Sequence, residues 1–141
     1  MADLRQASTI LHIATPGQAL VEITRDVTQW VDDQGMDEGL LTLFCRHTSA
    51  SLTIQENAAP AVRTDLLDWL DRMAPQDHPY AHDDEGPDDM PAHIRTMLTG
   101  VSLTIPLIGG RLALGTWQGI YLIEHRRARH RREVALHVLG R

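Results

Sequence analysis

The stretch VSLTIPLIGGRLALGTWQGIYLIEHR (101–126) decides the fold class of this chain. It contains an apolar segment over 101–107, the pair Gly109-Gly110, a short segment over 111–114 and a third segment over 117–125. A glycine pair between two strand-length segments predicts a β-hairpin, because both central residues of a type I′ turn need a positive φ. Strands joined by such short turns pair antiparallel, so this stretch predicts an antiparallel sheet.

The same pattern of short strands continues on both sides of this stretch. Strands are predicted over 4–13, 19–24, 51–55 and 133–139, and the apolar run 39–46 predicts a strand buried on both faces. Helical spacing and capping residues predict helices over 26–33, from the cap Asn57 to Pro75, and from Asp88 or Asp89 to Gly100. Residues 1–141 are therefore expected to form a single domain, mainly β with flanking helices (α+β), built as an antiparallel β-sandwich.

The composition excludes several classes of chemistry. The chain has one cysteine, Cys45, so it has no internal disulfide and no cysteine-rich zinc or iron–sulfur module. All thirteen basic residues are arginine, which excludes a Schiff-base lysine and a Walker-type phosphate lysine. Eight histidines remain for proton transfer or metal binding near neutral pH.

The charge is unevenly distributed along the chain. The net charge is −6, and no nucleic-acid partner is expected. The run HRRARHRR (125–132) is positive, and it is interpreted either as a solvated tip between two strands or as a phosphate contact. No apolar stretch is long enough to span a membrane and no secretory signal is evident, so a cytoplasmic location is expected.

A first polar segment is HTSAS (47–51), between two predicted strands. Its residues suit either an oxyanion or imidazole-orienting site, or a strand-end turn in which the hydroxyls bond their own backbone. A nucleophile pair of His47 with Cys45 or with Ser49 has little support, because no GxSxG elbow is present and nothing indicates a lowered thiol pKa. Cys45 is interpreted as a small strand hydrophobe.

A second polar segment is HDDEGPDDMPAH (82–93), where two histidines flank five carboxylates. Carboxylates at this density repel one another unless a cation, a helix N-terminus or water relieves them. The segment is therefore either an acidic surface loop whose last aspartate caps a helix, or a site for a divalent metal that accepts nitrogen and oxygen ligands.

The third segment is the predicted strand over 117–125, with polar residues at both ends. Two-residue alternation places Trp117, Tyr121 and His125 on one face, and Gln118 and Glu124 on the other. His125 at the end of an apolar face is either a satisfied core histidine or a ligand.

Three motifs, HTSASLTIQENAAPAVRTDL (47–66), HDDEGPDDMPAHI (82–94) and SLTIPLIGGRLALGTWQGIYLIEHR (102–126), resemble the YjbQ family in sequence and order. The resemblance covers the chain from about Ile10 onward. It implies a β-sandwich-like domain with flanking helices, assembly as a homotrimer and a metal-bound histidine cluster. For some members it also implies a secondary thiamine-phosphate synthase activity, which couples a pyrimidine pyrophosphate to a thiazole phosphate and releases pyrophosphate.

The motif residues define the expected site. A divalent metal, expected to be zinc, is assigned to His82, His93 and His125, with His47 as the alternate third ligand. Catalytic roles are expected for His47, Ser49, Asp89, Gln118, Glu124 and Arg126. Contacts with a phosphorylated small molecule are expected from Thr48, Ser49, Asn57, Trp117 and Arg126.

Two other functions stay open at this point. The same pocket would also serve a non-catalytic module that binds a metabolite or metal, or a metal-assisted phosphoester hydrolase. The histidines outside the motifs are interpreted as surface or structural residues: His12, His78, His130 and His137. Subunits of the expected trimer would meet acidic face to basic face, because residues 1–92 are acidic overall and 93–141 basic.

Overall fold

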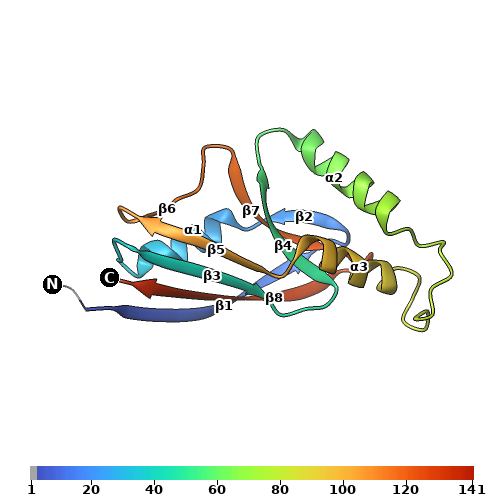
Figure 1. Cartoon of the computed structure of the whole chain (residues 1–141), viewed down its shortest axis with the longest axis horizontal. Helices are drawn as coiled ribbons and strands as arrows, with labels where there is room; N and C mark the ends of the chain where they lie inside the picture. The colour runs from blue at the N-terminus through green and yellow to red at the C-terminus, as the bar shows by residue number, and fades with distance from the viewer. Residues whose placement is uncertain (1–2) are drawn as a thin grey trace.

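Two antiparallel β-sheets and three helices account for most of residues 3–141, which a computed structural model describes (Figure 1). The predicted α+β class is confirmed, and the predicted elements are found with shifted ends. The strands are β1 (Arg5–Thr15), β2 (Ala19–Glu22), β3 (Gly39–Cys45), β4 (Ala50–Glu56), β5 (Ser102–Ile108), β6 (Arg111–Leu112), β7 (Gln118–Glu124) and β8 (His130–Gly140). The helices are α1 (Thr24–Asp33), α2 (Pro60–Met73) and α3 (Asp89–Thr99).

The larger sheet has the strand order β1-β8-β3-β5-β6, and the smaller sheet has the order β2-β7-β4. The predicted hairpin is present: β5 pairs with β6, and Gly109 and Gly110 have φ of 59° and 77°. The arginine-rich run 125–132 is not a simple hairpin tip, because β7 and β8 lie in different sheets. The run crosses between the sheets, and it takes Arg132 into the interior, where this side chain is 5% exposed.

The main hydrophobic core lies between the two sheets. Alternate residues of β8 point inward, and α1 adds Val27 and Val31 to the same core. The outer face of the larger sheet is not covered by a helix (Figure 1), so β3 is buried on one face only. The prediction that 39–46 is buried on both faces was wrong: Leu40 and Phe44 are 46% and 49% exposed.

Helix α2 packs on the other face of the smaller sheet. Its leucines pack on Leu20, Tyr121 and Ile123, so both faces of β7 are buried. The helix begins at Pro60, as predicted, but its N-cap is Ala59 and not Asn57. The Asn57 side chain instead donates a hydrogen bond to Glu22.

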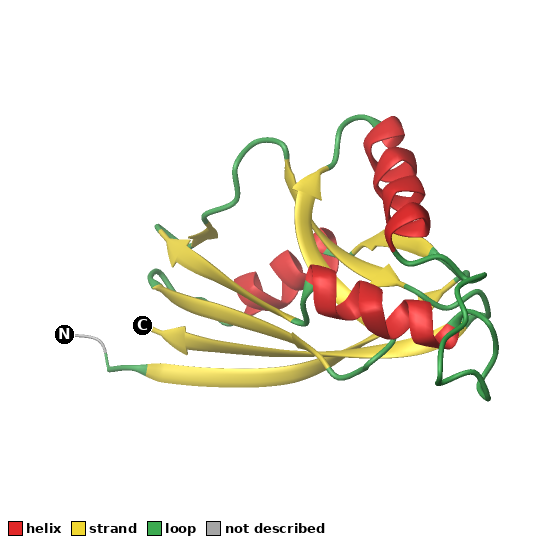
Figure 2. Ribbon diagram, turned by 45° about the vertical axis from the view of Figure 1, so that its right-hand side comes forward, coloured by secondary structure: helices red, strands yellow, loops and turns green. Residues whose placement is uncertain are grey.

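The loop over 74–88 leaves the end of α2, extends beyond it and returns to the start of α3 (Figure 2). Helix α3 begins at Asp89 with Asp88 as N-cap, and Gly100, with a φ of 95°, follows its last residue. These ends agree with the prediction, because Pro91 suits a first turn and glycine a helix end. No helix in the described residues is long and apolar enough to cross a membrane.

Candidate metal centre

His82, Asp89 and His93 converge at the point where the loop over 74–88 meets the first turn of α3. The Oδ2 atom of Asp89 lies 2.7 Å from Nε2 of His82 and 3.1 Å from Nε2 of His93. Asp89 and His93 are four residues apart on one helix, so their side chains lie on the same face. One ligand atom from each of the three residues lies within 4.8 Å of the other two.

Arg126 holds the carboxylate of Asp89 from the other side. Its Nη1 donates to Oδ1 of Asp89 at 2.7 Å, and its Nε donates to Oδ2 of Asp88 at 3.0 Å. Burial alone would raise the pKa of Asp89, but the hydrogen bond from His82 and the charges of His93 and Arg126 outweigh it and lower that pKa. Asp89 is therefore ionised at neutral pH, with Oδ1 fixed and Oδ2 directed at the two histidines.

The orientation of His93 is set by a backbone carbonyl. Its Nδ1 lies 3.0 Å from the carbonyl oxygen of Thr48, and a carbonyl can only accept, so Nδ1 carries a proton. In the neutral ring, Nε2 then presents a lone pair to the Asp89 carboxylate. That contact is attractive only when a cation lies there, either a second proton on the ring or a metal ion.

His82 lies in the loop and is surrounded by carboxylates. Besides Asp89, its Nε2 lies 3.0 Å from Glu85, and its Nδ1 lies 3.4 Å from Asp84. The hydrogen bond with Asp89 raises the pKa of His82 above its ordinary value. This negative environment favours a positive charge at His82.

Two hollows border the cluster. An open groove of about 790 Å³ is lined by His93 together with Phe44, Arg46, His47 and Thr48, among others. A second hollow of about 260 Å³ lies on the side of His82, and Tyr80 is part of its wall. The histidine pair is therefore accessible from two sides.

His125, the predicted third ligand, lies elsewhere in the described structure. It is 1% exposed, and its Nε2 lies 2.8 Å from Oγ of Ser51. Burial, with a smaller effect of Arg95, lowers its pKa to about 3. In place of His125, the third group beside His82 and His93 is Asp89.

His47, the alternate ligand, accepts a hydrogen bond at Nε2 from the backbone N–H of Glu133 at 2.8 Å. Burial lowers its pKa, so it is neutral at physiological pH and lines the groove. Cys45 beside it is 1% exposed, and burial raises its thiol pKa, which fits the interpretation as a strand hydrophobe. The hydroxyl of Ser49 accepts from Arg132 at 2.9 Å, and no contact joins it to His47 in the described structure.

Three expected site residues lie at the opposite end of β7 from Glu124. Trp117 is 63% exposed, Gln118 accepts a hydrogen bond from the backbone of Gly115, and Asn57 contacts Glu22. An extended strand rises about 3.3 Å per residue, so β7 separates them from Glu124 by roughly 20 Å. Within one chain, these three residues do not line the hollows beside the histidine cluster.

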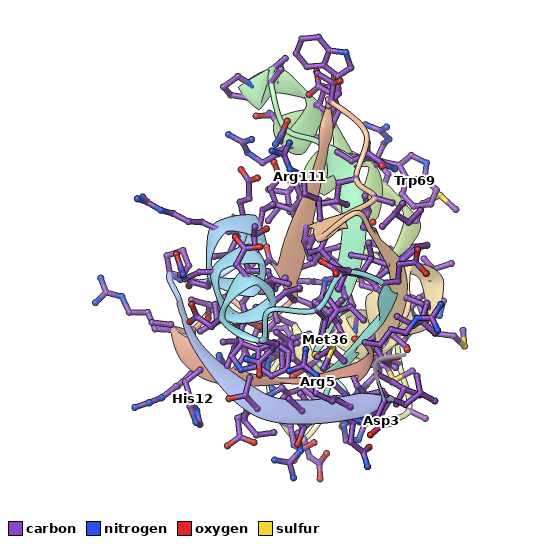
Figure 3. The ribbon with its side chains drawn as sticks, turned by 90° about the vertical axis from the view of Figure 1, so that its left-hand side faces the viewer. Asp3, Arg5, His12, Met36, Trp69 and Arg111 are labelled. Atoms are coloured by element: carbon purple, nitrogen blue, oxygen red, sulfur yellow. The ribbon has the colours of Figure 1, made fainter. Side chains whose placement is uncertain are left out.

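His12 was expected to lie outside the site, and its side chain projects from β1 into solvent (Figure 3). It points away from the core, which contains Met36.

Sequence reasoning missed Arg132 and Thr15. Both contact the fully buried carboxylate of Glu124, with Nε of Arg132 and Oγ1 of Thr15 each 2.7 Å from its Oε1. The burial of Arg132 could have been predicted, because this residue continues the two-residue alternation of the inward-facing Val134, Leu136 and Val138. The charge of the run 125–132 obscured that alternation.

Comparison with known proteins extends over nearly the whole chain. The family model described as UPF0047 protein YjbQ-like matches residues 9–141. A UPF0047 protein of Synechocystis sp. is 51% identical over 140 residues, which cover 99% of this chain and 95% of that protein. A conserved hypothetical protein from Thermus thermophilus is 38% identical with a TM-score of 0.81, covering 91% of this chain and 97% of that one. A YbjQ-like protein of unknown function from Sulfolobus solfataricus has the same fold, with a TM-score of 0.91 at 24% identity, covering 99% of this chain and 100% of that one.

Proposed function

This chain belongs to the UPF0047 family of YjbQ-like proteins, and we propose that it binds a divalent metal through His82, Asp89 and His93 and acts there on a phosphorylated small molecule. The main support for the proposal is the orientation of His93. Its Nδ1 donates to the Thr48 carbonyl oxygen, so in the neutral ring the lone pair of Nε2 points at the Asp89 carboxylate. A metal ion relieves this contact and uses all three groups as ligands.

The donor set suits zinc. Two imidazoles and one carboxylate, with further positions open, form the ligand set of catalytic zinc sites, in which water or substrate occupies the remaining position. Donors about 2.0–2.1 Å from a tetrahedral zinc ion lie roughly 3.3 Å apart. At Asp89 Oδ2, the separation of 3.1 Å from His93 is close to that value, and the separation of 2.7 Å from His82 is shorter.

The charges around the cluster support the proposed substrate class. Arg126 is engaged with Asp88, Asp89 and the carbonyl oxygen of Glu85, so it positions a ligand and is not free to meet a phosphate. In the larger hollow, Thr48 offers a hydroxyl, and the guanidinium of Arg46 is already paired with Glu133 at 2.7 Å. A bound divalent cation supplies the charge that neutralises a phosphate or pyrophosphate.

Among the possible reactions, the two hollows favour a two-substrate transfer. The thiamine-phosphate synthase reaction implied by the family resemblance joins a pyrimidine pyrophosphate to a thiazole phosphate. A C–N bond forms between the thiazole nitrogen and the pyrimidine methylene carbon, the C–O bond to pyrophosphate breaks, and pyrophosphate leaves with the electron pair. One hollow on each side of the histidine pair provides room for one partner each.

The first test is metal content. Untagged protein is expected to hold close to one zinc per chain, and His93→Ala to lose it, whereas His12→Ala, an exposed histidine outside the cluster, keeps it. Less than about 0.1 metal per chain in the wild type, with no further loss in His93→Ala, would overturn the proposal.

The second test is turnover with both substrates. Pyrophosphate release near 1 s⁻¹ only when both partners are present supports the synthase, since typical kcat values are about 1–10³ s⁻¹. Phosphate or pyrophosphate release without the thiazole phosphate supports a phosphoester hydrolase. Metal-dependent binding of either substrate without turnover supports a binding module.

We also propose the homotrimer that the family resemblance implies. The supporting observation is the uncovered outer face of the larger sheet, where Leu40 and Leu139 are paired and are 46% and 45% exposed. Exposed apolar patches of this kind mark interaction surfaces. Light scattering is expected to give three times the chain mass at micromolar concentration, and a monomer mass would contradict the trimer.

A further inference from the structure

Glu124 is a carboxylate with no exposed surface at the end of β7. Its Oε1 accepts from Thr15 Oγ1 and from Nε of Arg132, and its Oε2 accepts from Nη2 of Arg132 and from the backbone N–H of Arg126 at 3.1 Å. Burial would raise its pKa, but the hydrogen bonds from Arg132 and Thr15 outweigh burial and lower it. The group is therefore a buried carboxylate paired with a buried guanidinium.

The first connection runs from Arg132 to His93. The Nη2 atom of Arg132 donates to Ser49, to the hydroxyl at 2.9 Å and to the carbonyl oxygen at 3.2 Å. These two bonds fix the turn over 47–49, and the Thr48 carbonyl in that turn accepts the Nδ1 proton of His93. The orientation of His93 therefore depends on the position of the Arg132 guanidinium.

The second connection runs from Glu124 to Asp89. The backbone N–H of Arg126 is held by Glu124, and the guanidinium of the same residue holds Oδ1 of Asp89 at 2.7 Å. Asp88 is fixed by the same segment, through the backbone N–H of Arg127 at 2.8 Å. The buried Glu124–Arg132 pair thus anchors the supports of two of the three cluster residues, Asp89 and His93.

We propose that the buried Glu124–Arg132 pair is a positioning device that holds His93 and Asp89 in the geometry for metal binding; this inference rests on the metal site proposed above. A buried ion pair is a poor source of stability, because an apolar pair of similar volume often replaces it without loss. Outer partners of metal ligands, by contrast, typically change metal affinity by about 10–100-fold when removed. The two residues touch neither hollow beside the cluster, so their role is to position and not to react.

The test compares zinc affinity in variants that stay folded. The double variant Glu124→Leu/Arg132→Met removes both charges together and leaves no unpaired buried ion. It is expected to bind zinc about 10–100-fold more weakly, measured by competition with a chromophoric chelator. Arg132→Lys is expected to weaken binding as well, because an ammonium lacks the planar fork that reaches Glu124 and Ser49 together.

The matched control is Leu107→Ala, a core truncation in β5, which destabilises the fold but leaves zinc affinity unchanged. The d–d absorption spectrum of the cobalt-loaded protein reports the ligand geometry, and it is expected to change in the double variant and not in the control. Wild-type zinc affinity and an unchanged cobalt spectrum in a folded double variant would overturn the positioning role.

A second readout separates this inference from the metal site itself. The ¹⁵N shifts of the His93 ring in metal-free protein report whether Nδ1 carries the proton. If the wild type binds no zinc but the double variant loses the Nδ1–H form of His93, the positioning role is supported and the metal site is refuted. If the wild type binds zinc and the double variant keeps both the Nδ1–H form and the affinity, the positioning role alone is refuted.

Discussion

Exchanging His125 for asparagine is expected to flatten the dependence of folding stability on pH. His125 is 1% exposed in the folded chain, where burial, followed by the charge of Arg95, lowers its pKa from 6.5 to about 3. Between those two values the unfolded chain binds a proton at this position and the folded chain does not. The stability that His125 contributes is therefore complete above pH 6.5 and decreases as the pH falls toward 3.

The magnitude follows from the size of the pKa shift. Each pH unit below the unfolded pKa lowers the free energy of unfolding by about 1.4 kcal/mol. From about pH 6.5 to pH 5 the wild type is expected to lose roughly 2 kcal/mol through this group. His125→Asn has no titrating group at this position, so that loss is absent.

The assay is urea unfolding at about pH 7, 6 and 5, at one protein concentration, followed by circular dichroism. The difference in free energy of unfolding between the two proteins should change by roughly 2 kcal/mol over this range, with the wild type losing more. Ser51→Ala is the control: it removes the hydrogen bond at a cost of about 1–3 kcal/mol but keeps the histidine and its pH dependence. A difference between wild type and His125→Asn that stays constant from pH 7 to pH 5 would refute the reasoning.

Three further predictions concern the core and the backbone. Leu136→Ala is expected to lower the free energy of unfolding by about 2–5 kcal/mol, because this side chain is 1% exposed between the sheets, and urea titration measures it. Gly39→Ala should lower the free energy of unfolding, measured by the same titration, by about 1–3 kcal/mol, because the added methyl group would collide with the carbonyl oxygen of Leu139. Gly35→Ala should lower it by only about 1 kcal/mol, because the space around Gly35 is open and only its φ of 63° is unfavourable for alanine. Cys45 should react with a thiol reagent only after denaturation, since it is buried with a raised pKa, and rapid labelling of the folded protein would contradict this.

The order and type of the elements could be predicted because each depends on local pattern. The glycine pair at 109–110 fixed the β5–β6 hairpin, and the apolar spacing of 60–73 with Pro60 at its start predicted α2. Which strands share a sheet is not local. β7 and β8 follow one another, yet β8 pairs with β1 and β3, because the chain crosses between the sheets at 125–129.

The candidate site was predictable only in part, for a related reason. Asp89 and His93 lie four residues apart in a helix that the sequence indicates, so their proximity follows from helix geometry. The choice of His125 as the third ligand rested on the resemblance and on the wide spacing of the motif histidines along the chain. Two-residue alternation does place His125 on the face of Tyr121 and Ile123, but only the fold shows that its imidazole is buried there against the Ser51 hydroxyl and not at the cluster.

The arrangement of the arginines supports the proposal that a metal, and not an arginine, attracts the phosphate of the proposed substrate. The chain has no lysine, and the donors of Arg126 and Arg132 are engaged with Asp88, Asp89, Glu124 and neighbouring backbone. On the larger hollow, the arginine found in the described residues is Arg46, and Glu133 already pairs with it at 2.7 Å. These arginines therefore organise the carboxylates and the 47–49 turn. In the proposed function, the attraction for a phosphorylated substrate comes from a cation held by His82, Asp89 and His93, so substrate affinity and metal affinity are expected to be lost together.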